Sequence, residues 1–182
     1  MYVDPDPECD EEGWGTARAA AAPVAVAVAL GGAYVGTYGL ERFFDYVTML
    51  GEYGVVVQFG VLAAVVAAHE AIHAVAYAVL CGLSRDEVAV EAALFPDGSL
   101  DPLHVSVHPD RAVRRWRYAV GVAAPGVLLG LVPSAVGLAT DNPLAAFVGL
   151  YGVLLVATDV PALVEAWTLP DYVAASDPAR AP

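Results

Sequence analysis

The stretch GVVVQFGVLAAVVAAHEAIHAVAYAVLCGL, residues 54–83, is long and apolar enough to form a helix across the roughly 30 Å hydrocarbon layer of a membrane. Three ionisable residues, His69, Glu70 and His73, interrupt it within little more than one helical turn. Burying such side chains away from water costs several kcal/mol unless they are paired or bound to a metal ion. The stretch therefore predicts a membrane helix that carries a metal site.

The composition of the whole chain also indicates a membrane protein. Hydrophobic residues make up 58% of the 182 residues and the mean hydropathy is +0.60, whereas soluble domains contain roughly 45–50% apolar residues. The net charge is −13 and all 8 basic residues are arginine. This pattern suggests a salt-adapted organism, because carboxylates keep a surface hydrated where ion pairs are screened. The lack of a sizeable basic face excludes nucleic-acid binding.

Four apolar segments are each long enough to span a membrane as a helix. They cover about residues 19–40, 54–83, 118–140 and 144–167. Between the first two, ERFFDYVTMLGEY (residues 41–53) mixes aromatic and charged residues and indicates an interfacial segment. The predicted fold is an all-α integral membrane protein, a four-helix bundle over residues 19–170. An acidic disordered tail (1–18) precedes it, and a disordered tail (171–182) follows it.

The polar insertion between the second and third helices, residues 84–117, predicts a small β-hairpin. EVAVEAALF (87–95) and LHVSVH (103–108) have strand-like patterns and flank the turn signal Pro96-Asp97-Gly98. The insertion also holds the arginines at positions 85, 111, 114, 115 and 117. Because positive charge favours the cytoplasmic side, we expect the hairpin and both termini in the cytoplasm of a multi-pass cell-membrane protein.

HEAIH matches the pattern H-E-x-x-H. Two histidines four residues apart lie on the same face of a helix, so the imidazoles of His69 and His73 can bind one Zn²⁺ ion. Glu70 can reach the water-bearing position of such a site and act as general base. Tyr77, one turn beyond His73, could stabilise an oxyanion, although an ordinary packing aromatic is the default interpretation.

A catalytic zinc normally takes three protein ligands and a water molecule, so a third ligand is required. His69 lies 15 residues past Gly54, and Asp159 likewise lies 15 residues past Leu144. Two helices of the same direction, with about 1.5 Å rise per residue, would place both groups at one level, which favours Asp159. The alternative for Asp159 is a solvated helix end. The other candidates are His104, His108, Asp110 and Glu165, for which a solvated or interfacial position is the default. The two strand histidines, His104 and His108, could instead line the entrance to the site.

An HEAIH motif in one membrane helix and an aspartate in a later one resemble the site-2 protease type of intramembrane metalloprotease. The layout is more similar to the DUF3267 family of zincin peptidases, with HExxH in the second of four helices, a strand-like insertion, a proline-bearing third helix and a late aspartate. The resemblance covers about residues 54–167. It implies His69, His73 and Asp159 as zinc ligands and Glu70 as catalytic acid/base. No glycine follows Asp159, which argues against a true site-2 protease.

These observations predict a membrane-embedded zinc endopeptidase that lies in membrane lipid and acts on a membrane-associated protein or peptide. A helical substrate must unwind to be cut, and the hairpin could receive the extended segment by strand addition. One alternative is a non-catalytic metal-binding or partner-holding membrane protein, against which the intact Glu70 speaks. Another is a haem-binding redox protein, which the shared helical face of the two histidines disfavours. A transporter is disfavoured by the lack of an internal repeat.

Overall fold

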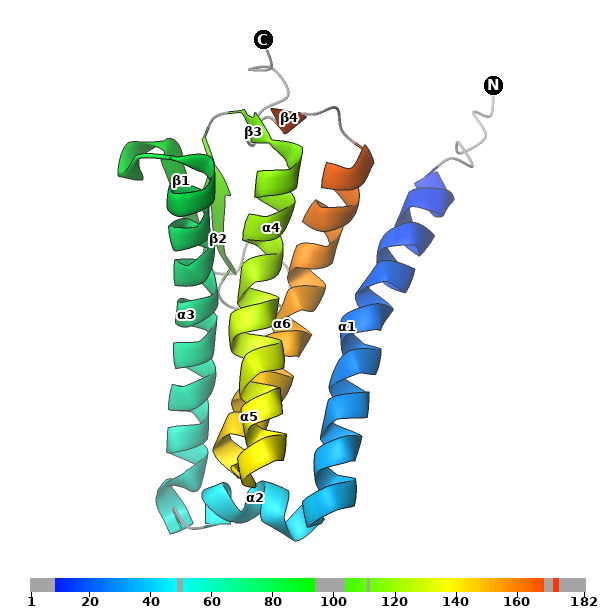
Figure 1. Cartoon of the computed structure of the whole chain (residues 1–182), viewed down its shortest axis with the longest axis vertical. Coiled ribbons are helices and arrows are strands. Elements are labelled where there is room, and N and C mark those ends of the chain that lie inside the picture. The colour runs from blue at the N-terminus through cyan, green and yellow to red at the C-terminus, as the bar shows by residue number, and fades with distance from the viewer. Residues whose placement is uncertain (1–8, 49–50, 94–103, 111, 169–171, 174–182) are drawn as a thin grey trace, which may run out of the picture.

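The computed structural model describes residues 9–48, 51–93, 104–110, 112–168 and 172–173, which are mostly helical (Figure 1). The helices are α1 (Cys9–Tyr38), α2 (Leu40–Thr48), η1 (Gly51–Tyr53), α3 (Gly54–Cys81), η2 (Arg85–Glu87), α4 (Arg115–Pro125), the π-helix η4 (Gly126–Leu131), α5 (Val132–Thr140) and α6 (Pro143–Thr168). The strands are β1 (Val88–Ala93), β2 (His104–Pro109), β3 (Val113–Arg114) and β4 (Tyr172–Val173).

Among the described residues, four helical segments are long and apolar enough to cross a membrane, which agrees with the predicted number of spans. They are Ala21–Tyr38 within α1, Gly54–Cys81, the continuous run Arg115–Thr140, and Pro143–Val160 within α6. The second span ends where Gly82 adopts a left-handed conformation with φ of 64°, a common helix stop. Placement of these helices in a bilayer stays a prediction.

The described structure extends into both segments that were predicted to be disordered tails. Helix α1 begins at Cys9, within the predicted tail 1–18. The helix continues through the boundary at residue 18 because residues 17–22 are mostly alanine, the residue with the highest helix propensity. Tyr172–Val173, within the predicted tail 171–182, form strand β4 because their backbone pairs with β3. The other residues of the two tails lie outside the described residues.

The four long helical segments alternate in direction (Figure 1). Helices α3 and α6 run the same way, as the choice of Asp159 assumed, and α1 and the α4–α5 run point the opposite way. The start of α1, the end of α6 and the strands therefore lie at one end of the molecule. Helix α2, from the segment predicted to be interfacial, lies across the other end and leads from α1 toward α3.

The third span is one continuous helical run with a local change of winding. Pro125 closes α4, the π-helix η4 follows, and α5 begins with Pro133 in its first turn. Proline removes a backbone N–H and its ring crowds the preceding turn, so widening of the helix next to Pro125 has a direct steric cause. The third helix was expected to contain proline, but the π-helix was not predicted.

Small residues bring the third span close to α6. A Cβ atom added at Gly137 would lie 2.6 Å from the backbone nitrogen of Ala146, and one added at Gly130 would lie 2.8 Å from a methyl group of Val153. Gly149 faces Ser134 in the same way. Backbones that approach this closely gain van der Waals contact, which is a main attraction between helices in lipid.

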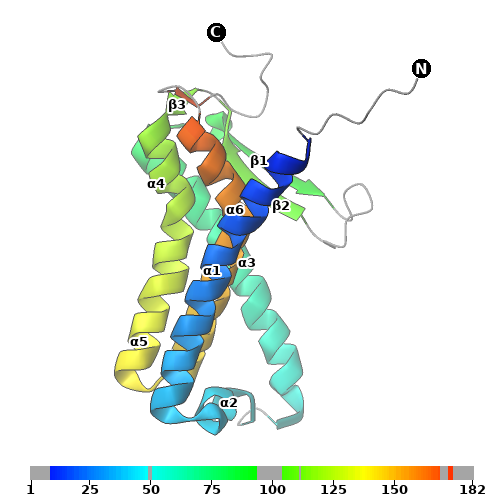
Figure 2. The same cartoon turned by 90° about the vertical axis from the view of Figure 1, so that its right-hand side faces the viewer.

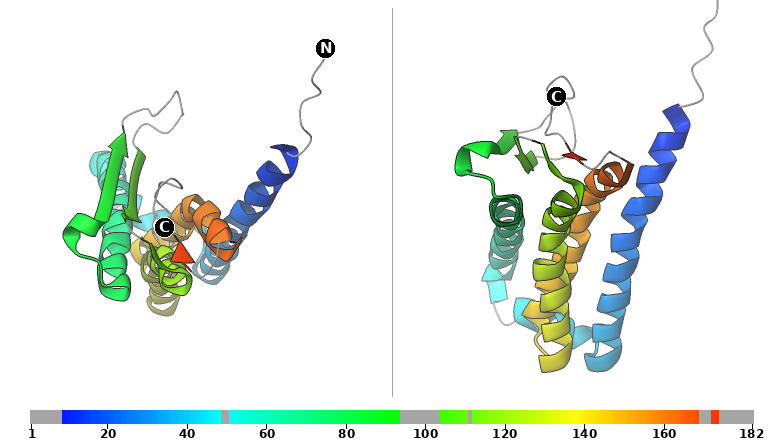
Figure 3. Two further views of the ribbon diagram at one scale, coloured as in Figure 1. Left: turned by 90° about the horizontal axis from the view of Figure 1, so that it is seen from above. Right: turned by 45° about the horizontal axis from the view of Figure 1, so that its top comes forward.

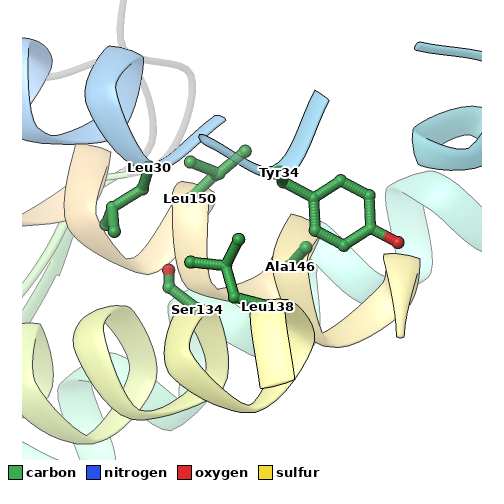
Figure 4. Close-up of a pocket in the computed structure, with 6 residues that line it drawn as sticks. All are labelled: Leu30, Tyr34, Ser134, Leu138, Ala146 and Leu150. Atoms are coloured by element: carbon green, nitrogen blue, oxygen red, sulfur yellow. The ribbon is translucent and has the colours of Figure 1, made fainter. Parts of the chain in front are cut away.

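Helix α1 completes the bundle on the other side of α6. Figure 4 shows a narrow apolar crevice where α1, α5 and α6 meet, lined by Leu30, Tyr34, Ser134, Leu138, Ala146 and Leu150. At its edge, the Tyr34 hydroxyl donates to Asp141 over 3.1 Å, and Arg42 Nε lies 3.0 Å from the same carboxylate. These contacts tie the end of α1 and the start of α2 to the α5–α6 turn, far along the bundle from the strands.

Helix α3 packs through only part of its length. Its first half diverges from α5 (Figure 2), and Val56 and Phe59 are 70% and 68% exposed there. Helix α3 contacts α4 and α6, and its second half buries His69, His73 and Tyr77. The segment of α3 that carries the HEAIH motif is therefore the part held inside the bundle.

The hairpin β1–β2 lies beside the end of α3, as seen from above in Figure 3. Its strands are antiparallel, with Val88 opposite Pro109 and Ala93 opposite His104, which confirms the predicted hairpin. The predicted turn Pro96-Asp97-Gly98 lies outside the described residues. Strands β3 and β4 form a second, two-residue antiparallel pair beside the start of α4.

Candidate metal centre

Helix α3 brings the two histidines of the motif together inside the protein. His69 and His73 are 2% and 4% exposed, and their ring centroids lie 4.8 Å apart. Their Nε2 atoms approach to 3.2 Å, so both rings turn the same nitrogen toward one point. Glu70 lies on the same helix, half-buried, three residues before His73 and hence next to it on the helix surface.

Asp159 of α6 closes this group from the neighbouring span. One carboxylate oxygen lies 3.1 Å from His69 Nε2, and the other lies 3.3 Å from His73 Nε2. The Asp159 side chain is only 14% exposed. Counting residues from the ends of the two spans thus predicted the level of Asp159 correctly, and its role as a metal ligand stays a prediction.

The arrangement of these three side chains fits a zinc ion. Zinc is held tetrahedrally with bonds of about 2.0–2.1 Å to nitrogen and oxygen, so two of its ligand atoms are separated by roughly 3.4 Å. The two histidine nitrogens lie 3.2 Å apart, and they lie 3.1 and 3.3 Å from the two different oxygens of the Asp159 carboxylate, which is close to that value. With one ligand atom taken from each residue, the three atoms lie within 4.8 Å of one another. Asp159 Oδ2 has no hydrogen-bond partner among the described residues, although His69 Nε2 is close. The ligand atoms of the three residues therefore gather around one point between α3 and α6.

Charge also favours a cation at this position. With neutral imidazoles, the three side chains carry one negative charge, and the adjacent Glu70 adds a second. Buried carboxylates are stable only when a cation or several hydrogen-bond donors compensate them. A divalent ion between His69, His73 and Asp159 would balance both charges.

The orientation of His73 is set by the third span. Its Nδ1 atom lies 3.1 Å from the backbone carbonyl oxygen of Gly121 in α4. A carbonyl can only accept a hydrogen bond, so Nδ1 carries the proton and Nε2 keeps its lone pair for the centre. Sequence reasoning missed Gly121, because the contact involves a backbone atom. Tyr77 is 2% exposed and stacks on His73, which fits the packing interpretation.

Two of the remaining candidate ligands, Asp110 and His108, are not brought to this centre. Asp110 is exposed, and its backbone N–H bonds to the carbonyl oxygen of Glu87. His108 is half-buried in β2, opposite Ala89 of β1. The side chains of His104 and Glu165 lie outside the described residues. Among the described residues, the one cluster of His, Cys, Asp or Glu side chains close enough to share a metal ion is His69, His73 and Asp159.

The chain matches a known protein family. The family model DUF3267, described as "Putative zincin peptidase", matches residues 62–173, which include the whole HEAIH motif, the hairpin strands and Asp159. Neither the curated proteins nor the solved structures gave a match to this chain.

Proposed function

Since this chain belongs to the DUF3267 family of zincin peptidases, we propose that it is a membrane-embedded zinc metallopeptidase that hydrolyses peptide bonds in or near the membrane. The observation that carries this proposal is the convergence of His69 Nε2, His73 Nε2 and the Asp159 carboxylate within 3.1–3.3 Å of one another. Three protein ligands with one position left for water or substrate are typical of catalytic zinc, whereas structural zinc is usually enclosed by four.

The proposed roles follow from the chemistry of each side chain. His69, His73 and Asp159 would hold the zinc ion, which when bound would supply Lewis acidity toward the scissile carbonyl and toward a water molecule. Glu70 takes a proton from the water molecule as the water oxygen attacks the carbonyl carbon. Glu70 then gives the proton to the amine nitrogen as the C–N bond breaks. Gly121 holds His73 in the orientation that leaves Nε2 free.

The proposed substrate is a membrane-associated protein or peptide. The four apolar helices support a position within lipid, and the site lies on the half of α3 nearest the hairpin. A helical substrate segment must unwind before cleavage, because its backbone carbonyls are already hydrogen-bonded. The hairpin β1–β2, next to α3, offers strand edges to which an extended segment could pair. The arginines of residues 84–117 favour the cytoplasmic side for this end.

A comparison of wild type with Glu70→Gln tests the proposal. Both proteins, purified in detergent, are loaded with zinc and incubated with a mixture of random-sequence peptides, and new peptide termini are counted by mass spectrometry. We expect one zinc per chain in both proteins and cleavage by wild type alone. Bound zinc with no cleavage above the Glu70→Gln background would favour the alternative, a non-catalytic metal-binding or partner-holding membrane protein.

A further inference from the structure

The backbone carbonyl of Gly121, in the third span, lacks its normal helical hydrogen-bond donor. In an α-helix the carbonyl of Gly121 would accept the N–H four residues later. That residue is Pro125, which has no N–H. The next backbone N–H, from Gly126, bonds to the carbonyl of Ala123 instead. The Gly121 carbonyl is thus available to His73, whose Nδ1 lies 3.1 Å away.

Because Gly121 has no side chain, the ring of Tyr77 can also pack directly against its backbone. A Cβ atom there would lie 2.6 and 2.8 Å from two ring carbons of Tyr77, closer than real Cβ atoms come. The Tyr77 ring stacks on His73 with a centroid separation of 6.0 Å and an angle of 13°. The Tyr118 ring in turn stacks with Tyr77, with a centroid separation of 5.8 Å and an angle of 3°. Glycine therefore makes room for Tyr77 in a stack of three rings, of which the His73 imidazole is one.

The geometry points to Pro125 and Gly121 as positioning residues that prepare His73 for metal binding. Pro125 leaves a carbonyl without a helical donor, and that carbonyl holds the Nδ1–H of His73. Gly121 also makes room for Tyr77, which fixes the plane of the imidazole ring. Together they direct Nε2 of His73 toward His69 and Asp159. This inference rests on the proposed metal centre, and it explains why the span opposite the motif contains a proline at residue 125.

Pro125→Ala is the most informative variant. Alanine is a better helix former than proline, so the variant should fold and its third span should be at least as stable as in wild type. The new N–H would compete with His73 for the Gly121 carbonyl. Loss of an outer hydrogen-bond partner typically weakens metal binding about 10–100-fold, and we expect a loss in that range. A purely structural role would instead leave zinc affinity unchanged or improve it.

Pro133→Ala provides the matched control, because Pro133 lies in the same span, two residues after the π-helix ends. Zinc affinity is measured by competition with a chromophoric chelator, and the visible spectrum of the Co²⁺-loaded protein reports ligand geometry. We expect Pro133→Ala to retain wild-type affinity and spectrum, and Pro125→Ala to lose affinity and change the spectrum.

Gly121→Ala is the second variant, and Gly130→Ala is its steric control. A Cβ at Gly130 would lie 2.8 Å from Val153 but touch none of the three candidate ligands. We expect Gly121→Ala alone to weaken zinc binding. Wild-type zinc affinity in Pro125→Ala, or an equal loss in both proline variants, would overturn the positioning role. A wild-type protein that binds no zinc would instead overturn the proposed function.

Discussion

Replacing Asp159 by alanine should weaken zinc binding by at least about 100-fold. The Asp159 carboxylate lies 3.1 and 3.3 Å from the two histidine nitrogens, which is why we propose it as a direct ligand of the metal and not as an outer partner of one. Removing an outer partner of a metal ligand costs about 10–100-fold in affinity, and removing a ligand should cost at least the upper value. A 100-fold loss corresponds to about 2.7 kcal/mol. Asp159→Asn keeps the volume of the side chain and should lose a similar amount, because a neutral amide is a poor zinc ligand.

The assay is zinc competition against a chelator of known affinity, with the protein in detergent. Asp110→Ala is the matched control, because Asp110 is an exposed acid close to the strands that was also a candidate ligand. It should bind zinc as wild type does. Retention of wild-type affinity, within about threefold, in both Asp159 variants would refute Asp159 as third ligand.

Three further outcomes are expected. Glu70→Gln should keep zinc at full stoichiometry and lower peptide cleavage by about 10²–10⁴-fold, the usual contribution of a general base, and unchanged turnover would remove Glu70 from the reaction. Chelation should abolish cleavage while circular dichroism keeps its helical signal, and re-added zinc at 100 times its Kd should stabilise the fold by about 2.7 kcal/mol; cleavage that persists in metal-free protein would contradict the metal's role. Gly152→Ala places a Cβ against the Leu129 carbonyl oxygen and 2.8 Å from Gly130 N, so it should lower the free energy of unfolding in a denaturing-detergent titration by about 1–3 kcal/mol, whereas Gly36→Ala, with nothing within 4 Å, should not; equal effects would argue against close packing of α6.

Much of the fold was predictable because the bilayer imposes a simple length requirement. Apolar runs of about 20 residues reveal spanning helices without any knowledge of their packing. The hairpin was predictable for a similar reason, since alternating residues on either side of a turn signal leave few other structures. The π-helix was not predictable, because Pro125 indicates a disturbance but not its form. The start of α1 was misplaced, since hydropathy marks where an apolar segment begins and not where a helix begins.

The candidate site was predictable to the extent that side chains define it. The spacing of His69 and His73 fixes a shared helical face, and residue counting placed Asp159 at their level. The Gly121 carbonyl was missed because sequence patterns describe side chains. A signal was nevertheless available: a proline four residues after Gly121 shows that this carbonyl lacks its helical donor. Whether that carbonyl faces His73 depends on how the third span packs against α3, and no pattern in the chain encodes this packing.

X-ray absorption at the zinc edge of the purified protein tests the central claim most directly. We expect one zinc per chain, bound by nitrogen and oxygen at about 2.0–2.1 Å, with the outer-shell scattering of two imidazole rings. That scattering should fall to one ring in His73→Ala. A protein that holds no zinc, or zinc bound to sulfur at about 2.3 Å, would contradict a centre made by His69, His73 and Asp159.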